Sequence, residues 1–287
     1  MTRANAYVLE TSDAELDRLL RAADLLAPIA ISAFRQAGLS VGSKAVDLGC
    51  GPLGALSALR RVVGDSGTVV GVDTSVAALA TARQALDRLG VDDVELVAAD
   101  INTLEPAQLG GDDFDLAHLR LVLMHQADPV GTLSRIARLL RPGGHLVALD
   151  FFAPPHLEPG LDAVDLAWDW VIGAMRARGA SPDASRRYRE LCDAAGFEVL
   201  SERGTFLPMP RPVIVDETIL LLSGARRGVE AGGLATAEEI DDLLAELRAH
   251  QAGSGRAWSP QTIELIARKR EPGTAGKPQV LATRPSG

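Results

Sequence analysis

The stretch Val46-Asp47-Leu48-Gly49-Cys50-Gly51 decides the fold class of this chain, because an apolar segment runs directly into a glycine-rich turn. Downstream of it, short apolar segments alternate with amphipathic ones. The apolar segments are residues 45–48, 68–72, 94–98, 114–119 and 145–151, and helical patterns occupy residues 55–63, 76–89 and 129–140. This alternation predicts parallel strands joined by right-handed helical crossovers. Strands that are apolar throughout indicate a sheet covered by helices on both faces.

The second half of the chain is less regular. Helical patterns occupy residues 161–175, 182–195, 214–229 and 235–250, and further strands are predicted at 197–205 and 262–269. About 50 residues separate those two strands, where a hairpin needs about 2–5, so we expect an insertion that shapes a pocket. The predicted organisation is an N-terminal helical cap (1–39), a cofactor-binding core (40–151), lid insertions with the remaining strands (152–270, the lid itself being 152–181 and 207–257) and a loose tail (271–287).

Composition and charge narrow the class of partner. The chain has 287 residues and a formal net charge of −9, which disfavours binding to nucleic acid through lysine and arginine contacts to phosphates. It contains no run of 18 apolar residues and no basic stretch followed by an apolar one near Met1, so we expect a cytoplasmic protein without a membrane span. Its two cysteines are far apart and show no metal-binding spacing, so no metal site is expected.

Polar side chains stand at the predicted carboxyl ends of five strands, where ligands bind in open parallel sheets. The turn Gly49 to Gly54 also reads G-x-G-x-x-G, and Asp73 follows 22 residues after Gly51, so an NAD(P)-dependent reductase is one interpretation. Three features disfavour it. Asp47 would face a pyrophosphate badly, Pro52 removes a backbone N–H that a pyrophosphate would use, and Asp100 ends the third strand where it can accept from an adenine amine.

Four segments in order resemble the motifs of class I S-adenosylmethionine-dependent methyltransferases. They are Val46–Gly51 (VDLGCG), Val70–Thr74 (VGVDT), Ala98–Asp100 (AAD) and Leu139–Gly144 (LLRPGG), and the resemblance covers roughly residues 40–151. It implies a Rossmann-like α/β fold with a seven-stranded, mostly parallel sheet. Its last strand would be antiparallel and lie beside the fifth, which places residues 262–269 there.

The resemblance also implies a cofactor site for S-adenosylmethionine, with S-adenosylhomocysteine as product. Gly49 and Gly51 would let the backbone approach the methionine part, Asp47 would lie near its amino group, and Asp73 would take the ribose hydroxyls. Asp100 would bind the adenine amine with Ile101 on the ring, and His118 and Leu119 would border the sulfonium. The full expected set is Tyr7, Asp47, Gly49, Gly51, Leu53, Asp73, Thr74, Asp100, Ile101, His118 and Leu119.

Two histidines and three aromatic residues are candidates for the chemistry and for the acceptor pocket. His118 and His125 are the bases within reach of the predicted cleft, although each is also explained as a packing residue. Phe151, Phe152 and Trp168 could wall an apolar acceptor pocket, whereas the helical stripe that contains Trp168 is typical of a core.

The predicted function is methylation of an oxygen, nitrogen or carbon atom of a small organic molecule. Three alternatives remain: a homologue that uses the cofactor for a reaction other than methylation, such as a cyclisation, the NAD(P)-dependent reductase, and a non-catalytic partner subunit. The sequence does not identify the acceptor, and it leaves open whether the chain forms a homodimer.

Overall fold

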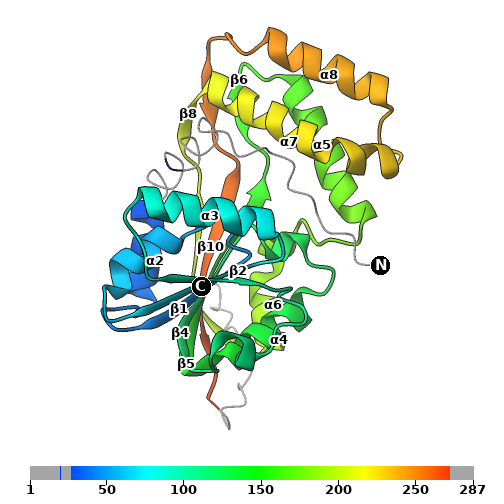
Figure 1. Ribbon diagram of the computed structural model, residues 1–287. Helices are drawn as coiled ribbons and strands as arrows, with labels where there is room; N and C mark the ends of the chain where they lie inside the picture. Colours follow the sequence, from blue (N-terminus) through cyan, green and yellow to red (C-terminus); the bar gives the residue numbers. More distant parts are fainter. Residues whose placement is uncertain (1–19, 21–26, 272–287) are drawn as a thin grey trace, which may run out of the picture.

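A seven-stranded sheet forms the core of the protein. The computed structural model describes residue 20 and residues 27–271. The strand order is β3-β2-β1-β4-β5-β10-β7, and β10 runs antiparallel to both of its neighbours (Figure 1). The strands are β1 (Lys44–Leu48), β2 (Thr68–Asp73), β3 (Val94–Ala98), β4 (Phe114–Arg120), β5 (Leu140–Ala153), β7 (Phe197–Thr205) and β10 (Gln261–Lys269). The predicted Rossmann-like sheet, with its last strand antiparallel beside the fifth, is confirmed.

Local sequence signals fix where several helices begin. Ser75 caps α3 by accepting from the Ala78 N–H, and Asp128 caps α4 by accepting from the Gly131 N–H. Such side chains satisfy donors that the first turn of a helix leaves free. The helices are α2 (Leu56–Val63), α3 (Val76–Arg88), α4 (Pro129–Leu139), α5 (Asp162–Ala177), α6 (Tyr188–Ala194), α7 (Arg211–Ala231) and α8 (Ala237–Ala249). Short 3-10 helices are η1 (Pro106–Leu109), η2 (Leu123–His125) and η3 (Ala184–Arg187).

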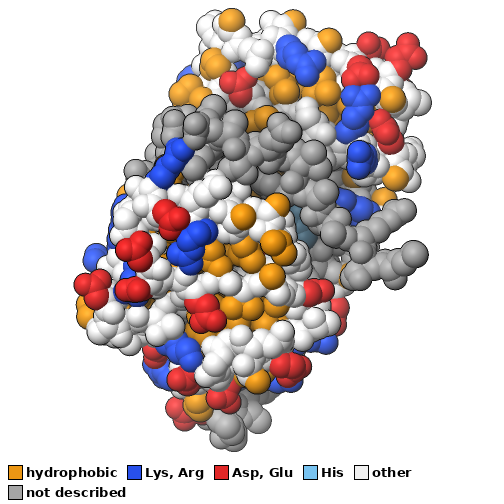
Figure 2. All heavy atoms as spheres, in the orientation of Figure 1, with side chains coloured by type: hydrophobic (Ala, Val, Ile, Leu, Met, Phe, Trp, Pro, Cys, Tyr) orange, Lys and Arg blue, Asp and Glu red, His pale blue; other side chains and the backbone are white. Residues whose placement is uncertain are grey.

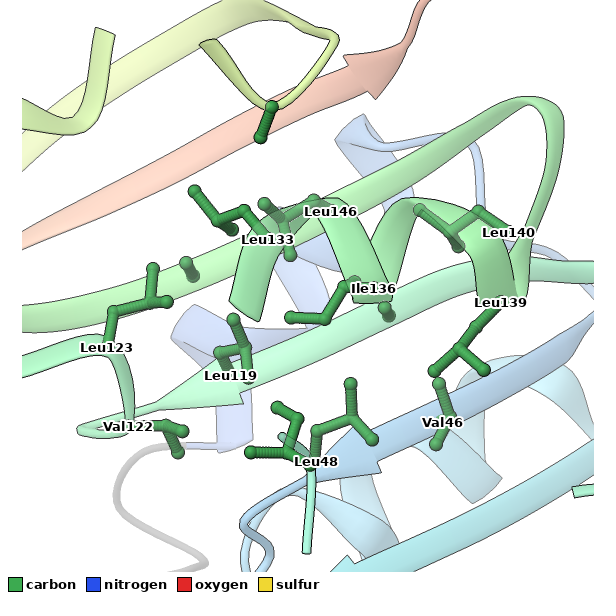
Figure 3. Close-up of a cluster of buried hydrophobic side chains, with 14 of the residues drawn as sticks. Val46, Leu48, Leu119, Val122, Leu123, Leu133, Ile136, Leu139, Leu140 and Leu146 are labelled. Atoms are coloured by element: carbon green, nitrogen blue, oxygen red, sulfur yellow. The ribbon is translucent and has the colours of Figure 1, made fainter. Parts of the chain in front are cut away.

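The sheet is covered on both faces, as the apolar strands indicate. Helices α4 and α6 pack on one face, which we call the α4 face, and Figure 3 shows Leu133, Ile136 and Leu139 of α4 against Val46 and Leu48 of β1. Helices α2 and α3 cover the other face, the α2 face, together with a helical segment at residues 27–36. Between these two helical layers the first five strands run parallel, so their carboxyl ends lie at one edge of the sheet.

A second layer stands beyond that edge and is called the lid here. It consists of α5, α7, α8 and a small sheet of β6 (His156–Glu158), β9 (Arg256–Trp258) and β8 (Pro208–Pro210), with a hydrophobic core of its own. Figure 1 shows β5 and β10 running from the core toward this layer. The small sheet was not predicted, because each of its strands has only 3 residues and shows no alternation. The single helix predicted over residues 182–195 is instead η3 followed by α6.

Some expectations fall outside the described residues, namely the contact of Tyr7 and nearly all of the tail at 271–287. On the face seen in Figure 2, acidic and basic side chains are interspersed, and no large basic patch forms among the coloured residues. No helix within the described ranges is long and apolar enough to cross a bilayer.

Candidate active site

The glycine loop between β1 and α2 turns sharply through left-handed backbone. Gly49, Gly51 and Gly54 have φ values of 70°, 56° and 55°, which side chains with a Cβ rarely adopt. The loop begins against β2, because the Val72 carbonyl accepts from the N–H groups of Gly49 at 2.8 Å and Cys50 at 3.0 Å. The sequence motif therefore marks a backbone conformation and a position at the carboxyl edge.

Charged side chains from three strands hold this loop. Asp47 Oδ2 accepts from the Ala55 N–H at 2.7 Å, and Asp73 Oδ2 accepts from the Gly51 N–H at 2.8 Å. Arg120 donates to the Gly54 carbonyl at 3.0 Å. Bonds in which one partner is charged are stronger than neutral ones, so the loop is fixed before any ligand binds.

The three glycines differ in what surrounds them. A Cβ on Gly49 would lie 2.6 Å from Val122 Cγ2, and one on Gly54 would fall on the Asp47 carboxylate and the Cys50 carbonyl. A Cβ on Gly51 would meet no atom of the described residues within 4 Å. Gly49 and Gly54 are therefore glycines because protein atoms crowd them, whereas no described residue crowds Gly51 beside Asp73.

Asp47 and His118 form a buried pair on neighbouring strands. Asp47 Oδ1 and His118 Nδ1 are 2.7 Å apart, the two residues are 1% and 3% exposed, and the Phe34 ring packs edge-on to His118. This burial does not support His118 as a base that reaches an acceptor. It also gives Asp47 a task other than direct contact with a ligand amine, since burial leaves its carboxylate facing only the Ala55 N–H and the His118 ring.

Two expected cofactor neighbours lie in the core instead. Leu119 is 1% exposed in the cluster beneath α4, as Figure 3 shows, and Leu53 is 2% exposed in the cluster on the α2 face. Successive residues of a strand point to opposite faces, so His118 and Leu119 cannot border the same space. The sequence located the strand end but not the direction of each side chain.

Other expected residues remain accessible at the carboxyl edge. Asp73 is half-buried, and Thr74 and Asp100 are exposed. Asp73 Oδ1 accepts from the Ser75 N–H at 2.8 Å and Asp100 Oδ1 from the Asn102 N–H at 2.8 Å, which fixes both carboxylates. Each carboxylate keeps further lone pairs for a ligand. Ile101, beside Asp100, is 9% exposed.

His125 ends η2, in the loop that follows β4, where the residue is in part open to solvent and in part surrounded by protein. Desolvation by the surrounding protein, with a smaller contribution from the positive charge of Arg178, lowers the pKa of His125. Arg178 caps the end of α5 in the lid. A lowered pKa keeps the ring neutral near pH 7, which is the form that accepts a proton.

The three aromatic residues expected around an acceptor do not come together. The Phe151 and Trp168 rings meet edge to face with centroids 5.4 Å apart, and Trp168 is 6% exposed in the lid core. Phe152 is turned to Arg186, whose guanidinium lies 4.3 Å from its ring centroid. The prediction of a pocket walled by all three is therefore corrected, because Phe151 and Phe152 point to opposite sides of β5.

Sequence reasoning missed Glu264 on β10, which is 7% exposed. Burial raises the pKa of its carboxyl, and the positive influence of Arg203 and His118 opposes that rise. The sequence does contain a signal for it, namely an acidic residue between apolar residues of a predicted strand. An acid at such a position is expected to be buried, and a buried acid requires partners. Within the described ranges, no three His, Cys, Asp or Glu residues gather as a metal site.

Comparisons with known proteins agree on a family. Residues 39–178 match a family described as a methyltransferase domain. Trans-aconitate 2-methyltransferase of Azoarcus sp. (strain BH72) is 31% identical over 234 residues, which cover 75% of this chain and 85% of that protein. The chain spans less of two other curated relatives that it matches, 29% and 46% of their lengths.

Solved structures share the fold. The YcgJ protein of Bacillus subtilis has a TM-score of 0.55 at 17% identity, covering 85% of this chain and 98% of that one. The [4+2]-cyclase SpnF has a TM-score of 0.51 at 19% identity, covering 88% of this chain and 81% of that one. At these identities the likeness concerns architecture alone, because one fold hosts many chemistries.

Proposed function

Since this chain belongs to the class I S-adenosylmethionine-dependent methyltransferases, we propose that it methylates an oxygen, nitrogen or carbon atom of a small organic molecule. The observation that carries the proposal is the fixed glycine loop, whose Gly51 is bonded to the Asp73 carboxylate and, among the described residues, has no atom crowding its Cα. Such an opening fits a ligand that approaches the backbone closely. The family relationship also favours this function over an NAD(P)-dependent reductase.

The residues at the carboxyl edge suit the parts of S-adenosylmethionine. Asp73 would accept from the ribose hydroxyls, Asp100 from the adenine amine, and the backbone at Gly51 would lie along the methionine part. Asp47 and Arg120 would act indirectly, because they hold Ala55 and Gly54 of the loop. The bound cofactor supplies an electrophilic methyl group, and the protein supplies orientation and exclusion of water.

His125 is the candidate base for an acceptor whose nucleophile carries a proton. It lies on the loop after β4, and the positive charge of Arg178, at the end of α5 in the lid, contributes to its lowered pKa. Arg178 would also attract an acceptor that bears negative charge. We therefore propose that small organic acids, including the trans-aconitate named for the Azoarcus relative, are the first acceptors to test.

Calorimetry with S-adenosylmethionine and S-adenosylhomocysteine tests the cofactor assignment. We expect wild-type protein to bind both, and Asp73→Ala to weaken binding about 10- to 100-fold, which corresponds to about 1–3 kcal/mol for lost hydrogen bonds. The matched control is Asp115→Ala, because Asp115 also accepts a backbone N–H, that of Lys44 at 2.8 Å, on the same sheet. Unchanged affinity in Asp73→Ala would remove Asp73 from the site.

Product formation separates methylation from the alternatives. Release of S-adenosylhomocysteine that depends on one acceptor would support methyl transfer. A cofactor that binds tightly yet stays intact while the true substrate is converted would favour a reaction such as a cyclisation. Binding of NAD without S-adenosylmethionine would overturn the proposal.

A further inference from the structure

The loop that joins β4 to η2 starts in a strained conformation. Leu121 has a φ of 58°, and within the described part of the chain it is the only residue other than glycine with a positive φ. A side chain with a Cβ adopts this region at a steric cost, so surrounding contacts must hold it there. One such contact is the bond from the Leu121 N–H to the Leu149 carbonyl of β5, at 2.7 Å.

A buried carboxyl lies beneath this loop. Asp150 on β5 is 1% exposed, and the hydroxyl of Tyr188, which is itself 0% exposed, donates to Asp150 Oδ2 at 2.9 Å. Asp150 Oδ1 has no hydrogen-bond partner within the described ranges. Buried acids without full pairing are rare and call for an explanation.

The backbone of the loop faces this carboxyl. Burial raises the pKa of Asp150 to about 7, whereas the Tyr188 hydroxyl and the backbone amides of Met124 and Val122 act in the opposite direction. Amides that lower the pKa of a carboxyl interact more favourably with its ionised form. Packing also places this loop beside Asp150: the Leu121 N–H bonds to the carbonyl of Leu149, the residue before Asp150, and Val122, Leu123 and Tyr188 lie in one buried cluster.

The same loop touches the candidate cofactor loop. Val122 packs so closely on Gly49 that a Cβ there would lie 2.6 Å from Val122 Cγ2. Helix η2 begins directly after Val122 and ends at His125, whose N–H donates to the Val122 carbonyl at 3.0 Å. A displacement of Val122 would consequently move both the wall of the glycine loop and the histidine.

We propose that Asp150, held by Tyr188, is a positioning residue that fixes the 121–125 loop and thereby sets both Gly49 and His125. The inference rests on the proposed function, in which the glycine loop holds the cofactor and His125 faces the acceptor. Asp150 acts through the loop and touches neither ligand.

The groups around Asp150 leave few sources of pH dependence. The pKa of Tyr188 is raised well above its usual value, mainly by burial, and burial raises that of Cys192 to about 12, so both stay neutral near pH 7. Glu202 contributes negative charge that raises both of these pKa values. Asp150, whose pKa is raised to about 7, changes its charge near neutral pH, and the pKa of His125 is lowered from its ordinary value.

Amide hydrogen exchange of the full chain tests the proposal without any acceptor. Asp150→Asn keeps the size of the side chain but turns an amide donor toward the N–H groups of Val122 and Met124. We expect exchange in residues 122–125 about ten-fold faster and affinity for S-adenosylhomocysteine about ten-fold weaker, because the neutral side chain no longer attracts these N–H groups as an ionised carboxylate does. Wild-type affinity should rise as the pH passes through about 7, and this rise should be absent from Asp150→Asn.

Two further variants keep the test decisive. Tyr188→Phe retains the carboxyl and removes one bond, so a smaller acceleration confined to the same amides is expected. Asp115→Asn is the control, because the Asp115 carboxyl also accepts a backbone N–H. Its amide exchange in residues 122–125 should match that of the wild type. Loop exchange within two-fold of wild type in both Asp150→Asn and Tyr188→Phe overturns the proposal. If Asp150→Asn unfolds, Tyr188→Phe decides. Wild-type protein that binds no S-adenosylhomocysteine would defeat the proposed function, and the exchange comparison would still decide the inference.

Discussion

Two buried aspartates on opposite faces of one sheet have different hydrogen-bond partners. Asp47, on the α2 face, uses both oxygens, one on the Ala55 N–H and one on His118. Asp150, on the α4 face, has one oxygen bonded to Tyr188 and one without a partner among the described residues. Both are 1% exposed and each lies under a loop at the carboxyl edge.

The two carboxyls differ in whether a change of pH can alter their charge and thereby their contacts. A fully bonded carboxylate fixes a loop permanently, and removing it strands donors that have no access to water. A carboxyl with an unfilled oxygen and a pKa of about 7 changes its charge near neutral pH, so its hold on a loop can vary. The predictions below separate these two behaviours.

The largest effect is expected for Asp47→Ala. The substitution leaves the Ala55 N–H and the His118 ring without an acceptor in a buried place, so stability should fall by about 2–6 kcal/mol, from about 1–3 for each stranded donor. Urea unfolding measures it. The partly exposed carboxyl in Asp115→Ala should cost clearly less, and equal losses in the two variants would contradict the contrast.

Gly54→Ala should be the next most damaging change. Its Cβ would collide with the Asp47 carboxylate and the Cys50 carbonyl at a φ of 55°, which predicts a loss of about 2–5 kcal/mol from crowding and backbone strain together. Gly51→Ala has a similar φ of 56° but free space, so only about 1–2 kcal/mol is expected. Thermal unfolding of both variants measures the loss of stability, and calorimetry measures S-adenosylmethionine binding. For Gly51→Ala we expect weak destabilisation together with lost affinity.

Asp150→Asn should change the pH dependence of stability. The pKa of Asp150 is about 7 in the folded chain, above its usual value of 3.8, so the folded state holds the proton more tightly. Its contribution is fully present below about pH 4 and is lost as the pH rises through about 7, by an amount on the order of 4 kcal/mol. Denaturant unfolding from pH 4 to 8 should therefore show a flatter profile for the variant, and parallel profiles would refute the assignment.

The smallest effect is expected for Tyr188→Phe. It removes one hydrogen bond and leaves a carboxyl that can stay neutral, so stability near pH 5 should fall by about 0.5–1.5 kcal/mol. Because the Tyr188 bond lowers the pKa of Asp150, the variant should shift the pH-dependent loss of stability to higher pH. A shift to lower pH would show that the hydroxyl does not favour the ionised form.

Much of the fold could be predicted because its signals are local. Strands 94–98 and 197–205 were placed at their observed bounds, and the strand at 261–269 within one residue. The small lid sheet escaped detection, since strands of 3 residues contain too little pattern. In the site, Gly49, Gly51 and Asp73 were found at the loop, whereas His118, Leu119 and Phe152 were expected to face a cleft and do not.

By itself, the sequence determined the parallel sheet and the sharp turn at Gly49 and Gly51, because apolar periodicity and glycine spacing are properties of neighbouring residues. The antiparallel last strand was expected only from the resemblance to a known family. The tertiary structure alone decided which strand-end acids are buried. Asp47 pairs with a histidine 71 positions away, and Asp150 pairs with a tyrosine 38 positions away. Whether a polar side chain faces solvent or a partner depends on which helix covers its face of the sheet, and no local pattern specifies that.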